Sequence, residues 1–333
     1  MTSRVLLCIF VLLVIHCLPA AYAAGRPIDQ EKFKQLRAEI EAARARVERQ
    51  SGPADQHHTL RLAFAEADHP WIKKELLSMA IAIGGPELEP FLLARLNDDD
   101  VRFRIAAAKA LGEQGSPHAI EPLLKRARAD PEGLAGWGSV RWHMTAQRDA
   151  LFALSEIGLR HPAHREAIAA SIAGVPVATD DLEDPKAQAL YVLTQDRALL
   201  HPFFERLADE DPETRAMGVV AFRLLKLKQA PEEVVVLLDD PERGVRSSVA
   251  LLLGEIGDPE TVPLLIGRAL DQAEDRGVRC NAIFSLGRMR TGRAEPVMRA
   301  LLQDESFKVN AAIALSRITG ERHPLVPDGY GLD

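Results

Sequence analysis

Residues 240–270 read DPERGVRSSVALLLGEIGDPETVPLLIGRAL, and this stretch decides the fold. Its first half carries apolar residues at i, i+4, i+7 and i+8, which is one face of an α-helix: Val245, Val249, Leu252 and Leu253. The pattern breaks between Gly254 and Pro259 and then resumes with helical spacing from 262 to 270. No stretch of comparable length alternates as a β-strand does. The segment therefore predicts two short amphipathic helices.

The leucine and glycine of this stretch recur along the chain. Ala-Leu-Gly occurs at 110–112, Leu-Leu-Gly at 252–254 and Ser-Leu-Gly at 285–287. With degenerate copies included, the anchoring leucines stand at 111, 154, 193, 224, 253, 286 and 315. One helix pair of this length cannot bury its own apolar face, so the copies must stack. The sequence predicts an all-α solenoid, a right-handed superhelix of about eight helix pairs.

Asp-Pro pairs mark the start of many of these helices. They stand at 184–185, 211–212, 240–241 and 258–259. The Asp carboxylate can accept hydrogen bonds from the free N–H groups of a helix start, and proline fits the first helical turn. We expect each of these Asp residues to cap a helix.

These motifs resemble HEAT repeats of the short, phycobilin-lyase-like kind. The resemblance covers roughly 71–320 and is sharpest at 240–270 and 101–124. It implies an α-solenoid and no single function, because such repeats serve many tasks. One catalytic HEAT-like family, the di-iron deoxyhypusine hydroxylases, carries His-Glu pairs in successive repeats. No histidine of this chain is followed by glutamate, so the resemblance does not extend to those ligands.

The N-terminus predicts export. Residues 1–23 carry one charge, Arg4, then an apolar run that ends before Ala21-Tyr22-Ala23, as in a secretory signal peptide cleaved ahead of Ala24. If the signal is cleaved, we expect no membrane span in the mature protein, which would be periplasmic or secreted. The alternative is that the segment stays as a membrane anchor or carries a lipid. Cys8 and Cys17 lie in the signal peptide, so the mature chain keeps one cysteine, Cys280, which we expect to pack in the core.

The mature chain divides into three parts. Residues 24–68 form an N-terminal capping region whose helix, 29–49, has a two-heptad apolar stripe; a dimer seam through this helix is the alternative. The solenoid covers 69–320 with insertions at 131–142 and 173–184, and 321–333 are a tail.

Composition and motifs argue against several functions. The charge of −7, from 41 Lys+Arg and 48 Asp+Glu, argues against nucleic-acid binding. The chain has no phosphate-binding Gly-x-x-x-x-Gly-Lys loop, no Gly-x-Ser-x-Gly elbow and no Cys-x-x-Cys. His161 and His164 could chelate a metal, but they lack a third ligand nearby in sequence. Acidic runs such as 98–100 precede helices, so we expect them to cap those helices. We therefore expect no cofactor, no metal and no catalytic residue.

What is left is a binding surface. The resemblance implies that the second helix of each pair lines a concave groove, and these helices carry recurring basic residues that would suit an acidic protein or peptide. Local pairing of these side chains with Asp and Glu is the alternative. Trp137, Arg141 and Trp142 in the insertion are a further hot-spot candidate. The predicted partner-binding residues are Arg95, Lys125, Arg126, Trp137, Arg141, Trp142, Arg206, Arg268 and Arg299.

The expected function is that of an exported, non-catalytic scaffold that binds a protein or peptide partner through its groove. The alternative is an enzyme of the lyase or isomerase type, related to the HEAT-repeat lyases that attach bilins. The two differ in what they require, because catalysis needs titratable side chains that converge on one place, whereas a scaffold needs only an extended patch.

Overall fold

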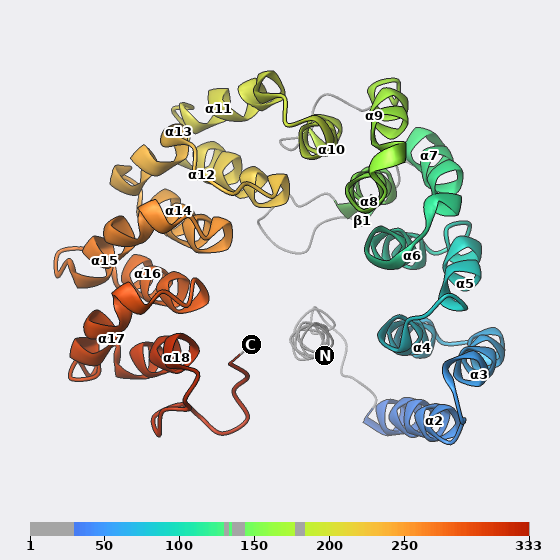
Figure 1. Ribbon diagram of the computed structural model, residues 1–333. Coiled ribbons are helices and arrows are strands. Elements are labelled where there is room, and N and C mark those ends of the chain that lie inside the picture. Colours follow the sequence, from blue (N-terminus) through green and yellow to red (C-terminus); the bar gives the residue numbers. More distant parts are fainter. Residues whose placement is uncertain (1–29, 130–132, 135–143, 177–183, 333) are drawn as a thin grey trace. The chain divides into compact units, whose positions relative to one another are not determined.

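The helices predicted from the repeat are present in the computed structural model, which describes residues 30–129, 133–134, 144–176 and 184–332 (Figure 1). The chain divides into two units, 1–178 and 179–333. The helices of the first unit are α2 (Gln30–Glu48), α3 (Pro53–Glu66), α4 (Pro70–Ile83), α5 (Leu88–Arg95), α6 (Val101–Gln114), α7 (Ile120–Ala129), α8 (Ala146–Arg160) and α9 (Arg165–Ala173). Those of the second are α10 (Pro185–Thr194), α11 (His201–Leu207), α12 (Pro212–Ala221), α13 (Glu232–Val235), α14 (Arg243–Ile256), α15 (Val262–Leu270), α16 (Arg276–Arg288), α17 (Glu295–Leu301) and α18 (Lys308–Thr319).

The all-α solenoid is confirmed, and the only strands in the described residues are two short ones. These are β1 (Gly133–Leu134) and β2 (Met144–Thr145), which pair antiparallel. Most of the predicted insertion at 131–142 lies between them, outside the described residues, as do 1–29 and 177–183. Among the helices described, none is both long and apolar enough to cross a membrane.

The pairing of the helices differs from the prediction. The sequence pattern suggested that the helix around 245–253 forms a pair with the one at 262–270. In the structure α15 instead packs against α16, and likewise α5 against α6, α7 against α8, α11 against α12 and α17 against α18. The repeat is therefore displaced by one helix. A periodic sequence has no marked beginning, so only the tertiary contacts fix which helix opens each hairpin.

The second helices of these hairpins form one continuous layer in each unit. In the second unit α12, α14, α16 and α18 stack directly on one another, and α11, α13, α15 and α17 make up the other layer (Figure 1). In the first unit α6 and α8 stack in the same way. The anchoring leucines of this layer are fully buried, with exposed fractions of 0% at Leu111, Leu253 and Leu286. Burial of each stabilises the fold by roughly 1.5–3 kcal/mol.

The glycine after each leucine allows this close stacking. A Cβ at Gly254 would lie 2.3 Å from the Cβ of Ser285, and one at Gly287 would lie 2.7 Å from the Cα of Ala314. Both distances are far inside van der Waals contact. The recurring Leu-Gly motif is therefore a packing motif, in which leucine fills the core and glycine admits the next helix.

The predicted Asp caps are confirmed at three of the four Asp-Pro pairs. At the fourth the prediction is wrong, because α14 begins at Arg243 with Glu242 in the cap position, and Asp240 accepts from the Glu242 N–H at 2.8 Å instead. Asp184 accepts a hydrogen bond from the N–H of Ala187 at 2.8 Å, and Asp211 accepts one from Thr214 at 2.9 Å. Asp258 accepts from the N–H of Glu260 at 3.0 Å. Each carboxylate satisfies a donor that the helix itself cannot use.

The N-terminal helix α2 packs against α3 and α4. Its stripe residues Ile40, Ala43 and Val47 are buried, and the ring of Phe33 stacks on Trp71 with centroids 5.3 Å apart. The apolar stripe of α2 is thus covered, over these three residues, by the helices that follow it.

Candidate functional site

The predicted partner-binding residues that the structure describes lie on α5, α7, α11, α15 and α17. These are the first helices of their hairpins. The basic residues therefore do not lie on the layer formed by α6 and α8, or on the layer formed by α12, α14, α16 and α18. That corrects the expected placement on the second helices. Trp137, Arg141 and Trp142 lie outside the described residues.

Most of these basic side chains have partners within the chain. The Arg95 guanidinium lies 3.3 Å from Asp98 and above the rings of Phe64 and Phe91. Arg126 donates to the Asn97 side chain at 2.7 Å. Local partners occupy these groups, as the alternative interpretation expected.

The same holds in the second unit. Arg206 lies over the ring of Phe203, Arg268 pairs with Asp239 and Glu274, and Arg299 pairs with Glu295 at 2.7 Å. Lys125 in the first unit is exposed. A role for these residues in partner binding stays a prediction.

A second set of arginines, which the sequence analysis did not single out, links successive repeats. Arg246 donates to the carbonyls of Asp240 and Pro241 at 2.7 and 2.9 Å, and to both oxygens of Glu274 at 2.7 and 2.9 Å. Arg215 makes the equivalent bonds to Asp240, at 2.7 and 2.9 Å. The signal in the sequence is an arginine four to six residues after the capping Asp.

Titratable side chains line the seam in the first unit where α6 and α8 adjoin. Lys109 and Glu113 are one turn apart on α6. Asp149, Glu156 and Arg160 on α8 are spaced by seven and four residues, which places them on one helical face. We call these five residues the α6–α8 charged stripe. The helical spacing was readable in the sequence, but the pairing of the two helices was not.

Asp149 is the most unusual member of this stripe. Its exposed fraction is 7%, its Oδ1 lies 3.7 Å from Lys109 Nζ, and its Oδ2 has no hydrogen-bond partner. Burial raises the pKa of this carboxyl and outweighs the opposing charges of Lys109 and Arg148. A buried carboxyl with a free oxygen and a raised pKa is typical of groups that carry protons.

Glu113 has a related environment. Burial and the nearby charge of Glu156 raise its pKa, against the effect of Lys109 and Arg160. Arg160 is held in place because it donates to the carbonyls of Gly112 and Gly115 at the end of α6, the latter at 3.0 Å. The stripe thus combines a buried acid, two further acids, an arginine held by backbone carbonyls and an exposed lysine that pairs with Asp149.

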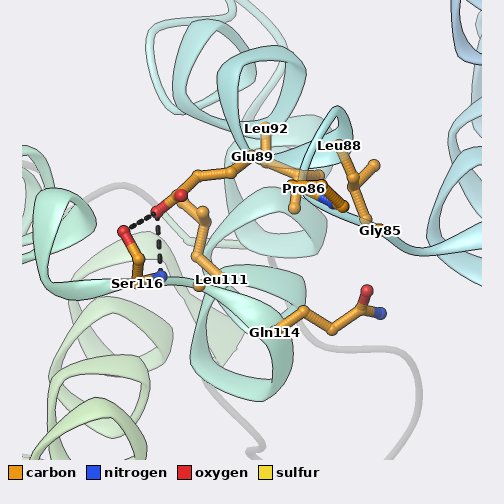
Figure 2. Close-up of a pocket in the computed structure, with 9 residues that line it drawn as sticks. Gly85, Pro86, Leu88, Glu89, Leu92, Leu111, Gln114 and Ser116 are labelled. Carbon is orange, nitrogen blue, oxygen red and sulfur yellow. Dashed lines mark hydrogen bonds between the residues drawn. The ribbon is translucent and has the colours of Figure 1, made fainter. Parts of the chain in front are cut away.

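A pocket of about 330 Å³ lies nearby, between α5 and the end of α6 (Figure 2). Its walls include Leu88, Leu92 and Leu111, and Glu89 is its one acidic residue. Glu89 Oε1 accepts hydrogen bonds from the Ser116 N–H at 2.9 Å and from its hydroxyl at 2.8 Å (Figure 2).

The other candidates from the sequence are not brought to these sites. Cys280 is half-buried, and burial raises the pKa of its thiol, as in a packing residue. His161 precedes a short 3₁₀ turn before α9, and His164 is the last residue of that turn. Within the described ranges no three His, Cys, Asp or Glu side chains gather as metal ligands would.

Family models identify HEAT repeats in this chain. The model for HEAT repeats matches residues 59–139 and 200–276, and the model for the PBS lyase HEAT-like repeat matches 278–304. The resemblance found in the sequence is therefore confirmed for the repeats themselves.

Two curated relatives are named deoxyhypusine hydroxylase. The protein from Candida albicans is 27% identical over 68% of this chain and 67% of its own length. The one from Eremothecium gossypii is 29% identical over 64% of this chain and 61% of its own. Among solved structures, human deoxyhypusine hydroxylase in complex with glycerol matches 81% of this chain and 98% of its own, with 18% identity and a TM-score of 0.36.

The curated relatives correct one expectation. Both are enzymes, which contradicts the expected non-catalytic scaffold and the expectation that this chain is not an enzyme. The α6–α8 charged stripe contains two carboxyl groups whose pKa is raised, Glu113 and Asp149.

The residues present do not fit the iron centre that this relationship implies. The chain has no His-Glu pair. His57 is buried, but its ring Nε2 lies 2.7 Å from the carbonyl oxygen of Gly84 and is occupied by that hydrogen bond. The donor set for an iron pair is thus missing, and no step of iron chemistry is carried over to this chain.

Proposed function

Because the chain contains HEAT repeats and its curated relatives are enzymes, we propose that it is an enzyme in which Asp149 transfers protons. The observation that carries this proposal is the environment of that carboxyl, which is buried and has one oxygen without a partner. Burial raises the pKa of this carboxyl, so it keeps its proton to a higher pH than an exposed Asp does. The reaction belongs to the isomerase or lyase type.

The residues of the stripe take separate roles in this proposal. Asp149 takes a proton from a carbon atom of the substrate and returns it to a neighbouring atom, so an isomerisation needs no other reactant. Its Oδ2 is buried, so substrate binding must displace the side chains that cover it. The Lys109 ammonium lies close enough to stabilise the carboxylate form of Asp149. Glu113 is exposed and has its own raised pKa, so it can exchange protons with solvent further along the stripe.

The substrate is a protein or peptide. Asp149 and Arg160 are eleven positions apart on α8, roughly 16 Å at the helical rise of about 1.5 Å per residue. An extended peptide of about five residues covers that length. The stripe carries both signs of charge, so it would select charged residues in that peptide.

Deuterium labelling tests this proposal. The protein is incubated in D₂O with a heat-denatured protein extract, which is then digested in H₂O and analysed by mass spectrometry. N–H and O–H positions lose their label, so only proton transfer to carbon is detected. We expect a small set of peptides to gain one deuterium with the wild type and none with Asp149→Asn.

Asp99→Asn is the matched control, because Asp99 is exposed and lies outside the stripe. It should label like the wild type. Labelling that survives in Asp149→Asn, or no labelling by the folded wild type, would contradict the proposal.

We also propose that the protein is exported, which the apolar run and Ala21-Tyr22-Ala23 support. Expression of the full chain in a bacterial host should yield a periplasmic protein whose intact mass is that of a chain beginning at Ala24. A mass that still includes Met1 would support the membrane-anchored alternative instead.

A further inference from the structure

Helices α14, α16 and α18 stack side by side, and each keeps a partly exposed side opposite the core of the second unit (Figure 1). On this side residues repeat at fixed distances from the anchoring leucine (253, 286 or 315), so equivalent residues form rows across the three helices. Five residues before the leucine stand Ser248, Asn281 and Asn310, and two residues after it stand Glu255, Arg288 and Arg317. None of the six is buried. We call this surface the α14–α18 face.

The charged row carries more positive than negative charge. Glu255 accepts a hydrogen bond from Arg288 at 3.1 Å and one at 2.6 Å from Arg223, which follows α12. Two guanidinium groups thus share one carboxylate, yet 49% of the Arg288 side chain and 47% of the Arg223 side chain stay exposed. Arg317 lies over the ring of Phe284, and its buried Nε has no hydrogen-bond partner among the described residues. The row therefore holds three arginines against one glutamate, on a chain whose overall charge is −7.

The polar row has hydrogen-bonding groups that the chain does not use. Asn281 Nδ2 donates to the Ser247 hydroxyl at 2.6 Å, which engages one of its two N–H bonds. The carboxamide of Asn310 is half-buried and makes no hydrogen bond in the part of the chain that the structure describes. A carboxamide offers donors and an acceptor, the same groups that a peptide backbone presents. The two asparagines can therefore bind the main chain of a second polypeptide.

An apolar row runs between the other two. It consists of Leu251, Phe284 and Ile313, which stand two residues before the anchoring leucine and are half-buried. Packed helices lie about 8–10 Å apart. A peptide in the polyproline II conformation repeats every three residues, which is about 9 Å at about 3.1 Å per residue. Such a peptide, crossing the three helices, would present equivalent residues to each helix in turn.

We propose that the α14–α18 face binds an extended acidic segment of another protein, laid across the three helices. Acidic side chains three positions apart pair with Arg288 and Arg317, and the residue beside each contacts the apolar row. The main chain binds Asn281 and Asn310, because a polyproline II peptide makes no hydrogen bonds within itself. An inorganic polyanion would satisfy only the arginines. This inference does not depend on the reaction at Asp149.

Selection from a library of random heptapeptides displayed on phage tests the proposal. The purified wild-type protein is the bait, and the selection is repeated with the double variant Arg288→Gln, Arg317→Gln. We expect the wild type to enrich peptides with two acidic residues three positions apart, each beside an apolar residue. The double variant should not enrich them, because both guanidinium groups are gone.

The most enriched peptide is then synthesised, and its affinity is measured by fluorescence anisotropy. Arg288→Gln should weaken binding about tenfold or more, because a hydrogen bond to a charged group is lost. Asn310→Ala should weaken it about threefold to tenfold, the effect of one neutral hydrogen bond. Arg299→Gln is the matched control, since Arg299 is an exposed arginine on α17, in the other layer, and it should bind like the wild type.

Three results would overturn the proposal. They are no enrichment of acidic peptides by the wild type, equal affinity of the wild type and Arg288→Gln, and unchanged affinity in Asn310→Ala with inorganic polyphosphate displacing the peptide. The last would reveal a plain anion site. Thermal unfolding shows that each variant is folded, and Asn310→Ala keeps the test valid if an arginine variant is not, since the Asn310 side chain has no partner to lose.

Discussion

Gly254→Ala should lower the free energy of unfolding by about 3 kcal/mol, the upper end of the usual cost of one added methyl group in a filled core. The new Cβ would lie 2.7 Å from the Cα of Ser285, which is backbone and cannot rotate away. Helices α14 and α16 would have to separate. The better helix propensity of alanine returns only about 1 kcal/mol.

Gly267→Ala is the matched control, because a Cβ there would meet nothing within 4 Å. Gly267 lies within α15, so this substitution should stabilise the protein by roughly 0.5–1 kcal/mol. Urea-induced unfolding followed by circular dichroism measures both. If Gly254→Ala costs no more than Gly267→Ala, the close packing described for the Leu-Gly motif is wrong.

Arg246→Met should cost about 3 kcal/mol at neutral pH, because it removes one partner of a buried ion pair. The Glu274 side chain is 2% exposed and would keep Arg268, at 3.4 Å, as its charged partner, together with the Asp275 backbone N–H at 2.6 Å. The carbonyls of Asp240 and Pro241 would also lose their donor.

The cost should depend on pH. Burial alone would raise the pKa of Glu274, but the hydrogen bonds from Arg246 and from the Asp275 backbone, with the charges of Arg246 and Arg268, outweigh it and hold the pKa below its usual range. The stability from this pair is fully present above the pKa of the unfolded carboxyl, about 4.3. It is lost as the pH falls through the lowered pKa of the folded state.

Urea unfolding from about pH 7 to about pH 3 measures this effect. The difference between wild type and Arg246→Met should shrink in acid. Arg299→Met is the control, since the Arg299–Glu295 pair is exposed and its loss should cost less than about 1 kcal/mol at any pH. A difference for Arg246→Met that stays constant with pH would contradict the role given to Glu274.

The helices and their starts could be predicted because they depend on residues a few positions apart. Helical spacing from Val245 to Leu253 and the Asp-Pro caps are short-range patterns, and the structure contains both. The stacked fold followed from the repeat, since one pair cannot bury its own apolar face. The function did not follow, because the chain carries no motif for it.

Tertiary packing decided the rest. Contacts between repeats decide which helix opens each hairpin. They also decide which carboxylate Arg246 meets about 30 residues later, and they bury Asp149 against α6. The insertion at 131–142 interrupts the repeat before α8, so the sequence does not show which residues of α6 and α8 face each other. The sequence by itself therefore determined the repeating helices. Only the packing between repeats, which sets burial and distance, brought Lys109 to Asp149 and Glu113 to Glu156.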